Sequence, residues 1–142
     1  MSETNTFLYI DDDADDLLIF GEALESLYPG VTVLKAQSGE EGVELLSKME
    51  ADSKPFPRLI ILDMNIPKMD GRQTLQTIRN NKNWQNIPVV IFTTTTNSAD
   101  MEFCKKYGAD CITKPMDYKS LTQTMQRLVS YSTLNYAGDT RE

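Results

Sequence analysis

Short apolar runs alternate along the chain with longer stretches in which apolar residues recur every three or four positions. Such runs are typical of strands buried on both faces, and the spaced positions are typical of amphipathic helices. The alternation predicts one doubly wound α/β domain, with five parallel strands, five helices and right-handed crossovers. The expected strands are residues 6–10, 31–34, 59–62, 88–92 and 111–113.

A polar residue suited to N-capping precedes each expected helix, because its side chain can accept the free N–H groups of the first turn. These residues are Asp13, Ser38, Asp70, Asn97 and Asp117. Ser38 followed by Glu41 has the spacing of a capping box, and Gly108 is suited to end the fourth helix. The last apolar position of the fifth helix is Val129. We therefore expect a single domain at residues 1–131, then a short polar tail at residues 132–142 with no output domain.

Composition narrows the class of protein. The 142 residues are 40% hydrophobic and 25% charged, as in ordinary soluble globular domains. The net charge of −7 argues against nucleic acid as a direct partner, and no apolar run is long enough to span a membrane. The chain has no histidine, which excludes a histidine base or metal ligand. Cys104 and Cys111 form no disulfide framework, which favours a reducing cytoplasm.

The strand ends carry most of the candidate chemistry. Asp11 and Asp12 follow the first strand, Asp63 follows the third, Thr93 follows the fourth and Lys114 follows the fifth. In a parallel sheet these ends lie on one edge, where ligands of open α/β sheets bind. Neighbouring carboxylates would repel one another unless a cation joined them, and hard oxygen ligands suit Mg²⁺. An aspartate is also a competent nucleophile, so this edge could carry a phosphoryl group on a carboxylate.

On these residues the chain resembles the receiver domains of bacterial two-component response regulators. The resemblance covers about residues 7–129 and implies a flavodoxin-like (βα)5 sandwich with strand order 2-1-3-4-5. It implies that Asp63 is the phosphoacceptor and that Asp11, Asp12 and Asp63 bind Mg²⁺ together with the backbone carbonyl of Asn65. Such a protein is a signalling module and not an enzyme.

The same resemblance implies roles for residues after the last two strands. Thr93 is the expected switch hydroxyl, and Thr94 lies beside it in the phosphate-binding region. Lys114 is expected to pair first with the acceptor carboxylate and then with the phosphoryl group. Pro115 is expected to follow a cis peptide bond. Receivers commonly have an aromatic residue three positions before this lysine, where this chain has Cys111, so backbone movement near Thr93 should carry more of the signal.

The resemblance also implies the partners. The phosphoryl donor would be a sensor histidine kinase or a histidine phosphotransfer protein, in the cytoplasm, without nucleic acid or membrane. Signalling would proceed by protein contact, including a possible homodimer through the fourth helix, fifth strand and fifth helix, at residues 97–107, 111–113 and 118–130. A phosphorelay intermediate is an alternative.

Two readings compete at the first acidic run. Asp11, Asp13, Asp15 and Glu22 have the offsets of a calcium-binding loop, but Asp16 stands where that loop requires glycine. A flavin-binding carrier of the same fold would place a Gly/Ser/Thr-rich loop there, whereas this acidic run would repel a phosphate that came without its own metal.

A Mg²⁺-dependent aspartyl-phosphate phosphatase is the remaining alternative. In the haloacid-dehalogenase-like enzymes a second aspartate, two positions after the nucleophile, performs the acid/base step. Here that position is Asn65, whose amide cannot transfer the proton, so a phosphatase is disfavoured.

Overall fold

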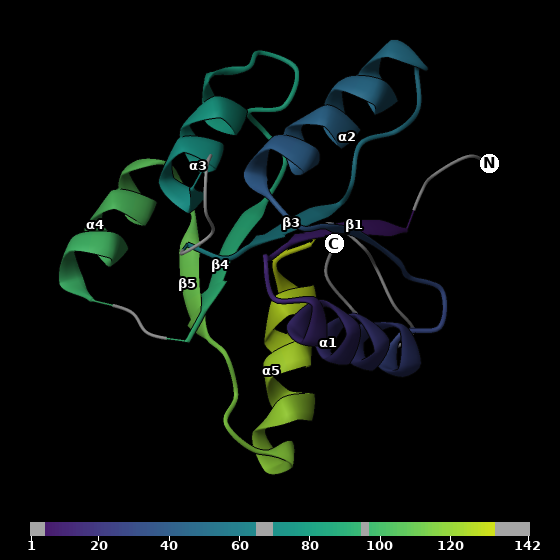
Figure 1. Cartoon of the computed structure of the whole chain (residues 1–142), viewed down its shortest axis with the longest axis vertical. Helices are drawn as coiled ribbons and strands as arrows, with labels where there is room; N and C mark the ends of the chain where they lie inside the picture. Colours follow the sequence, from purple (N-terminus) through teal and green to yellow (C-terminus); the bar gives the residue numbers. More distant parts are fainter. Residues whose placement is uncertain (1–4, 65–69, 95–96, 133–142) are drawn as a thin grey trace, which may run out of the picture.

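Five parallel strands form a central sheet with helices on both of its faces (Figure 1). The computed structural model describes residues 5–64, 70–94 and 97–132. The strand order is β2-β1-β3-β4-β5, which confirms the predicted order. Along the chain the elements are β1 (Thr6–Ile10), α1 (Ala14–Leu27), β2 (Thr32–Ala36), α2 (Gly39–Ala51), β3 (Leu59–Leu62), α3 (Gly71–Asn80), β4 (Val89–Thr93), α4 (Ser98–Lys106), β5 (Asp110–Thr113) and α5 (Tyr118–Ser130).

Two hydrophobic layers sandwich the sheet. Alternate residues of one strand point to opposite faces, so Phe7 and Tyr9 of β1 pack toward α1 and α5, whereas Leu8 and Ile10 pack among residues of α2, α3 and α4. Figure 1 shows α1 and α5 on one side of the sheet and α2 and α3 on the other. Every residue of β3 is buried, as expected for a central parallel strand. Because both faces are covered, polar chemistry is left to the strand ends.

All five helices begin at the predicted N-caps, including Ser38 at the start of α2. The side chains of Asp13, Asp70, Asn97 and Asp117 each accept a backbone N–H from the first turn of α1, α3, α4 and α5. The expected capping box of α2 is incomplete. Ser38 accepts the N–H of Glu41 at 3.0 Å, but the Glu41 carboxylate accepts the N–H of Gln37 and not that of Ser38.

Gly71, at the start of α3, lies against the backbone that leaves β3. A Cβ atom at this position would lie 2.5 Å from the Cα of Met64 and 2.7 Å from the carbonyl oxygen of Asp63. The N–H of Gly71 donates to the carbonyl of Met64 at 3.1 Å. A residue without a side chain is therefore needed for α3 to start this close to Asp63.

The described structure continues two residues past α5. Residues 133–142 of the expected polar tail lie outside the described residues. Within the part of the chain that the structure describes, no helix has the length and apolar character that crossing a bilayer requires.

Candidate functional site

The predicted site residues meet at the carboxyl edge of the sheet, where backbone hydrogen bonds continue just past the strands. The N–H of Asp11 donates to the carbonyl of Ala36, and the N–H of Asp63 donates to the carbonyl of Ile10, both at 3.0 Å. The N–H of Lys114 donates to the carbonyl of Thr93 at 2.8 Å. These contacts hold the backbone of the site residues in register with the sheet, so their side chains converge without depending on long loops.

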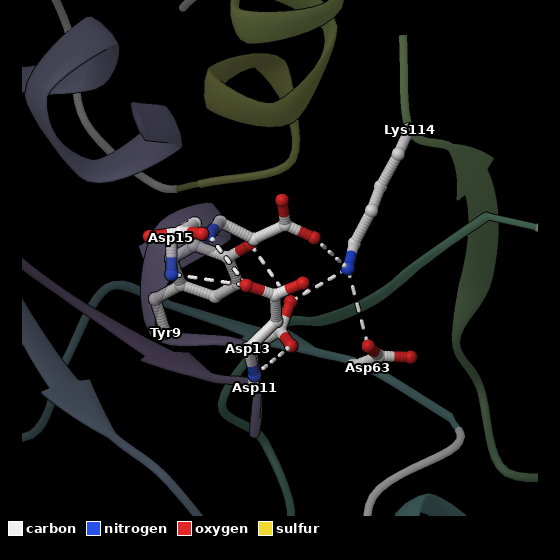
Figure 2. Close-up of polar contacts among 7 residues, drawn as sticks. Tyr9, Asp11, Asp13, Asp15, Asp63 and Lys114 are labelled. Carbon is white, nitrogen blue, oxygen red and sulfur yellow. Dashed lines mark hydrogen bonds and ion pairs between the residues drawn. The ribbon is translucent and has the colours of Figure 1, made fainter. Parts of the chain in front are cut away.

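The ammonium group of Lys114 is the centre of the site. Its Nζ lies 2.7 Å from Oδ2 of Asp11, 2.8 Å from Oδ2 of Asp16 and 3.1 Å from Oδ2 of Asp63. Figure 2 shows the lysine side chain reaching down between Asp11 and Asp63. The residue is only 5% exposed. Burial alone would lower the pKa of Lys114, but the hydrogen bonds that it donates to Asp11 and Asp16 and the charge of Asp63 raise it above its usual value, so the ammonium stays charged.

Asp11 is fully buried and accepts hydrogen bonds through both carboxylate oxygens. Oδ1 accepts the N–H of Asp13 at 2.9 Å, and Oδ2 accepts the hydroxyl of Tyr9 at 3.0 Å in addition to the Lys114 ammonium. Burial raises the pKa of Asp11, and the hydrogen bonds from Lys114 and Asp13 act in the opposite direction. Burial and the neighbouring carboxylate of Asp11 raise the pKa of Tyr9, so its hydroxyl remains a donor.

Asp11, Asp12 and Asp63 form a group suited to a divalent cation. Each can offer one carboxylate oxygen, and these oxygens lie within 4.8 Å of one another. Asp11 and Asp63 are buried, whereas Asp12 is exposed, so the group opens to solvent on one side. Hard oxygens in this number, with open positions for water or phosphate, fit Mg²⁺. Asn65, whose carbonyl was expected to complete the set, lies outside the described residues.

Thr93 supplies a buried hydroxyl at the end of β4. The residue is 2% exposed, and among the described residues its Oγ1 is a buried polar side-chain atom without a hydrogen-bond partner. Buried hydroxyls are nearly always paired, so an unpaired one needs an explanation. An acceptor oxygen of a phosphoryl group on Asp63 would provide that partner. Thr94 is exposed and takes no part in the contacts described above.

One detail corrects the sequence-based expectations. The described residues contain no cis peptide bond, so the expected cis bond before Pro115 is wrong for this structure. For a proline the trans bond is favoured by about 0.5–1 kcal/mol, and Lys114 reaches its three carboxylates with the trans bond in place. The calcium-loop alternative, already disfavoured by Asp16 at the glycine position, is also disfavoured by the structure, because α1 begins at Ala14 and the Asp13 carboxylate is used as its N-cap.

Asp16 is a site residue that the sequence reasoning missed, since it was considered only as a misfit to the calcium loop. The available signal was its position in the first turn of α1, near the strand end that carries Asp11. That position alone does not distinguish Asp16 from Asp15, which is exposed. Only the packing of α1 on the sheet turns Asp16 toward Lys114.

The fold and the site together define a class of proteins that carry a phosphoryl group on an aspartate at the carboxyl edge of a 2-1-3-4-5 sheet. Residues 7–126 match the family model of the response regulator receiver domain, and the chain belongs to that family. Receiver domains are the phosphoacceptors of two-component signalling, so the phosphatase and flavin-carrier readings are not favoured.

Curated relatives and solved structures agree with this family. The chain is 30% identical to the response regulator Rcp1 of Synechocystis sp. over 87% of this chain and 86% of that protein. It is 29% identical to protein PilH of Pseudomonas aeruginosa, over 87% of this chain and 96% of that one. The crystal structure of Mn²⁺-bound Rcp1 has a TM-score of 0.78 at 29% identity, covering 92% of this chain and 97% of that chain. The phosphorylated cyanobacterial phytochrome response regulator RcpA has a TM-score of 0.80 at 27% identity, covering 92% and 94%.

Proposed function

We propose that Asp63 accepts the phosphoryl group from a phosphohistidine of a sensor histidine kinase or a histidine phosphotransfer protein. The observation that carries this proposal is the position of its carboxylate, which lies 3.1 Å from the Lys114 ammonium and beside the carboxylates of Asp11 and Asp12. Both a cationic donor and a cation-binding group are thus within reach of the oxygen that would be modified. The similar response regulator RcpA has been solved in its phosphorylated form, which supports the same reading.

We propose Mg²⁺ as the cation that Asp11, Asp12 and Asp63 bind. A bound Mg²⁺ would neutralise and orient the oxygens of the transferred group. The Mn²⁺-bound structure of Rcp1 supports a divalent cation in this family, and the hard oxygen ligands of this chain favour Mg²⁺. The residues that remain, Lys114 and Thr93, have protons to donate to the phosphoryl oxygens.

In the transfer itself one oxygen of the Asp63 carboxylate attacks the phosphorus of the donor. The new O–P bond forms as the P–N bond of the phosphohistidine breaks, and the departing imidazole takes up a proton. No proton leaves Asp63, because an ionised carboxylate is already a nucleophile. We propose that the chain is not itself a hydrolytic enzyme, since the residue two positions after Asp63 is Asn65, which cannot act as a general base.

Intact mass spectrometry tests the acceptor. Wild type and Asp63→Asn are incubated with acetyl phosphate and Mg²⁺, and we expect one acid-labile phosphoryl group on wild type and none on the variant. Equal labelling of both proteins would refute the assignment of Asp63. Labelling that survives chelation of the metal would refute the assignment of Mg²⁺ but not that of Asp63.

For the output we propose contact through the face formed by α4, β5 and α5, including homodimerisation. A cleft of about 480 Å³ lies on this face, lined in part by Met101 and Lys105 of α4, Cys111 of β5 and Arg127 of α5. Met101 is 49% exposed. Apolar surface mixed with charges of both signs suits a twofold contact between identical copies.

Sedimentation with and without beryllofluoride, a mimic of the phosphoryl group, tests this output. We expect Thr93→Ala to accept phosphate but to lose phosphorylation-dependent dimerisation, because the hydroxyl that would move toward the phosphoryl oxygen is gone. Cys111→Ala should change little, since no aromatic ring stands at that position. The opposite pattern, with Cys111→Ala inactive and Thr93→Ala active, would contradict this account of the switch.

We propose a cytoplasmic location, where the kinases of two-component systems present their phosphohistidines. Cys104 and Cys111 are both free thiols. Burial raises the pKa of the Cys104 thiol to about 12, so it is protonated and unreactive at neutral pH.

A further inference from the structure

Asp16 differs from the other two carboxylates that contact Lys114. Its Oδ2 lies 2.8 Å from Nζ, almost as close as that of Asp11 at 2.7 Å, but Asp16 does not belong to the group of carboxylates suited to a cation. Its side chain is 23% exposed, whereas that of Asp11 is fully buried. Among the described residues no hydrogen bond to the Asp16 carboxylate is seen other than the one from Lys114.

The Lys114 ammonium has no donor to spare. A lysine carries three N–H groups, and three carboxylates accept from this one. A phosphoryl group on Asp63 can take over the contact to Asp63 itself, which at 3.1 Å is the longest of the three. Any closer approach of the ammonium to that group, or a second hydrogen bond to it, requires that the contact to Asp11 or to Asp16 is given up. The Asp11 carboxylate is also held by Tyr9 and Asp13. The partly exposed Asp16 can be solvated by water when it is released, so it is the contact that costs least to break.

We propose that Asp16 is a positioning residue that competes with the phosphoryl group for Lys114 and so slows phosphoryl acceptance at Asp63. The inference rests on the proposed role of Asp63 as acceptor. Two effects act in the same direction. Asp16 draws the ammonium toward α1, and its negative charge opposes the approach of an anionic phosphoryl donor. The charge of Asp16 would thus control the rate at which Asp63 is phosphorylated.

Phosphorylation rates of matched variants test the competition. Asp16→Asn removes the charge while keeping the size, and Asp15→Asn removes the same charge from the same first turn at an exposed residue away from Lys114. With acetyl phosphate and Mg²⁺, we expect Asp16→Asn to be labelled about three- to tenfold faster than wild type, from the loss of one nearby charge. Asp15→Asn should stay within about twofold, because solvent screens an exposed charge. Asp16→Glu should fall between wild type and Asp16→Asn.

A second measurement observes the contact without phosphorylation. The Lys114 ammonium, buried and fully hydrogen-bonded, should give a ¹⁵N signal whose protons exchange slowly with water. We expect faster exchange in Asp16→Asn and unchanged exchange in Asp15→Asn, a difference that loss of helix stability alone would not produce. Equal exchange in wild type and Asp16→Asn, or labelling of Asp16→Asn at the wild-type rate or slower, would overturn the inference. Failure of the acceptor assignment looks different, since it appears as equal labelling of wild type and Asp63→Asn.

Discussion

Lys114 and Thr93 lie at the ends of neighbouring strands and are joined by a backbone hydrogen bond, yet their side chains are in opposite states. Lys114 donates to three carboxylates, whereas Thr93 has a buried hydroxyl without a partner among the described residues. Both residues are almost completely buried, so exposure does not explain the difference. Without a phosphoryl group, every N–H of the Lys114 ammonium at the end of β5 has an acceptor. The Thr93 hydroxyl at the end of β4 has no partner among the described residues.

This difference shows what a phosphoryl group would change at each strand end. On the β4 side it would give the Thr93 hydroxyl an acceptor, and a buried hydroxyl without one costs about 1–3 kcal/mol. On the β5 side it would have to displace an existing hydrogen bond of Lys114. Phosphorylation would then move a hydrogen bond of Lys114 from α1 to the phosphoryl group at the end of β3, while the Thr93 hydroxyl of β4 gains an acceptor there, which is a local charge event acting on neighbouring elements.

The largest effect on stability should come from removing the three ion pairs of Lys114. Lys114→Met leaves the carboxylates of Asp11, Asp16 and Asp63 without the ammonium group that they share. We therefore expect the free energy of unfolding, measured by urea denaturation in the presence of a chelator, to fall by about 3 kcal/mol. Added Mg²⁺ should restore part of this loss, because it supplies positive charge to the same carboxylates. Lys119→Met, at an exposed residue of α5, is the control and should be nearly neutral. A Lys114→Met protein as stable as wild type without metal would mean that the lysine contacts contribute little.

A smaller effect should distinguish the cation-binding role of the carboxylates from their contacts with Lys114. Asp12 belongs to the candidate cation group but does not contact Lys114, so Asp12→Ala should weaken Mg²⁺ binding about tenfold, as measured by calorimetry. Without metal the variant should be slightly more stable, since one charge of a repelling group is removed. Asp15→Ala is the matched control, and an equal loss of Mg²⁺ affinity there would indicate a general charge effect in place of a ligand.

The smallest effect should have the opposite sign from that of the lysine variant. Thr93→Val replaces the unpaired hydroxyl by a methyl group of similar size, so we expect the unphosphorylated protein to gain up to about 1 kcal/mol in thermal or urea unfolding. Thr113→Val, at the exposed neighbour in β5, should show no such gain. A loss of stability in Thr93→Val would show that its hydroxyl is already satisfied and would remove the contrast with Lys114.

Much of this molecule followed from local patterns in the sequence. Continuous apolar runs predicted strands buried on both faces, and the caps at Asp13, Ser38, Asp70, Asn97 and Asp117 predicted where all five helices begin. The meeting of Asp11, Asp63, Thr93 and Lys114 followed from parallel topology alone, because parallel strands end on the same edge. The strand order and the individual roles came from family resemblance and not from the pattern.

The tertiary structure decided which side chains at that edge contact one another. The identity of Asp16 as a lysine partner depends on how α1 is rotated against the sheet, and its neighbour Asp15 carries the same charge one residue away. The unpaired hydroxyl of Thr93 and the trans bond before Pro115 likewise depend on packing. The need for glycine at position 71 also comes from packing, because its Cβ position is filled by the backbone of Asp63 and Met64. Sequence periodicity reports which face of an element is buried, whereas the direction of a long side chain and the space around it are set by elements distant in the chain.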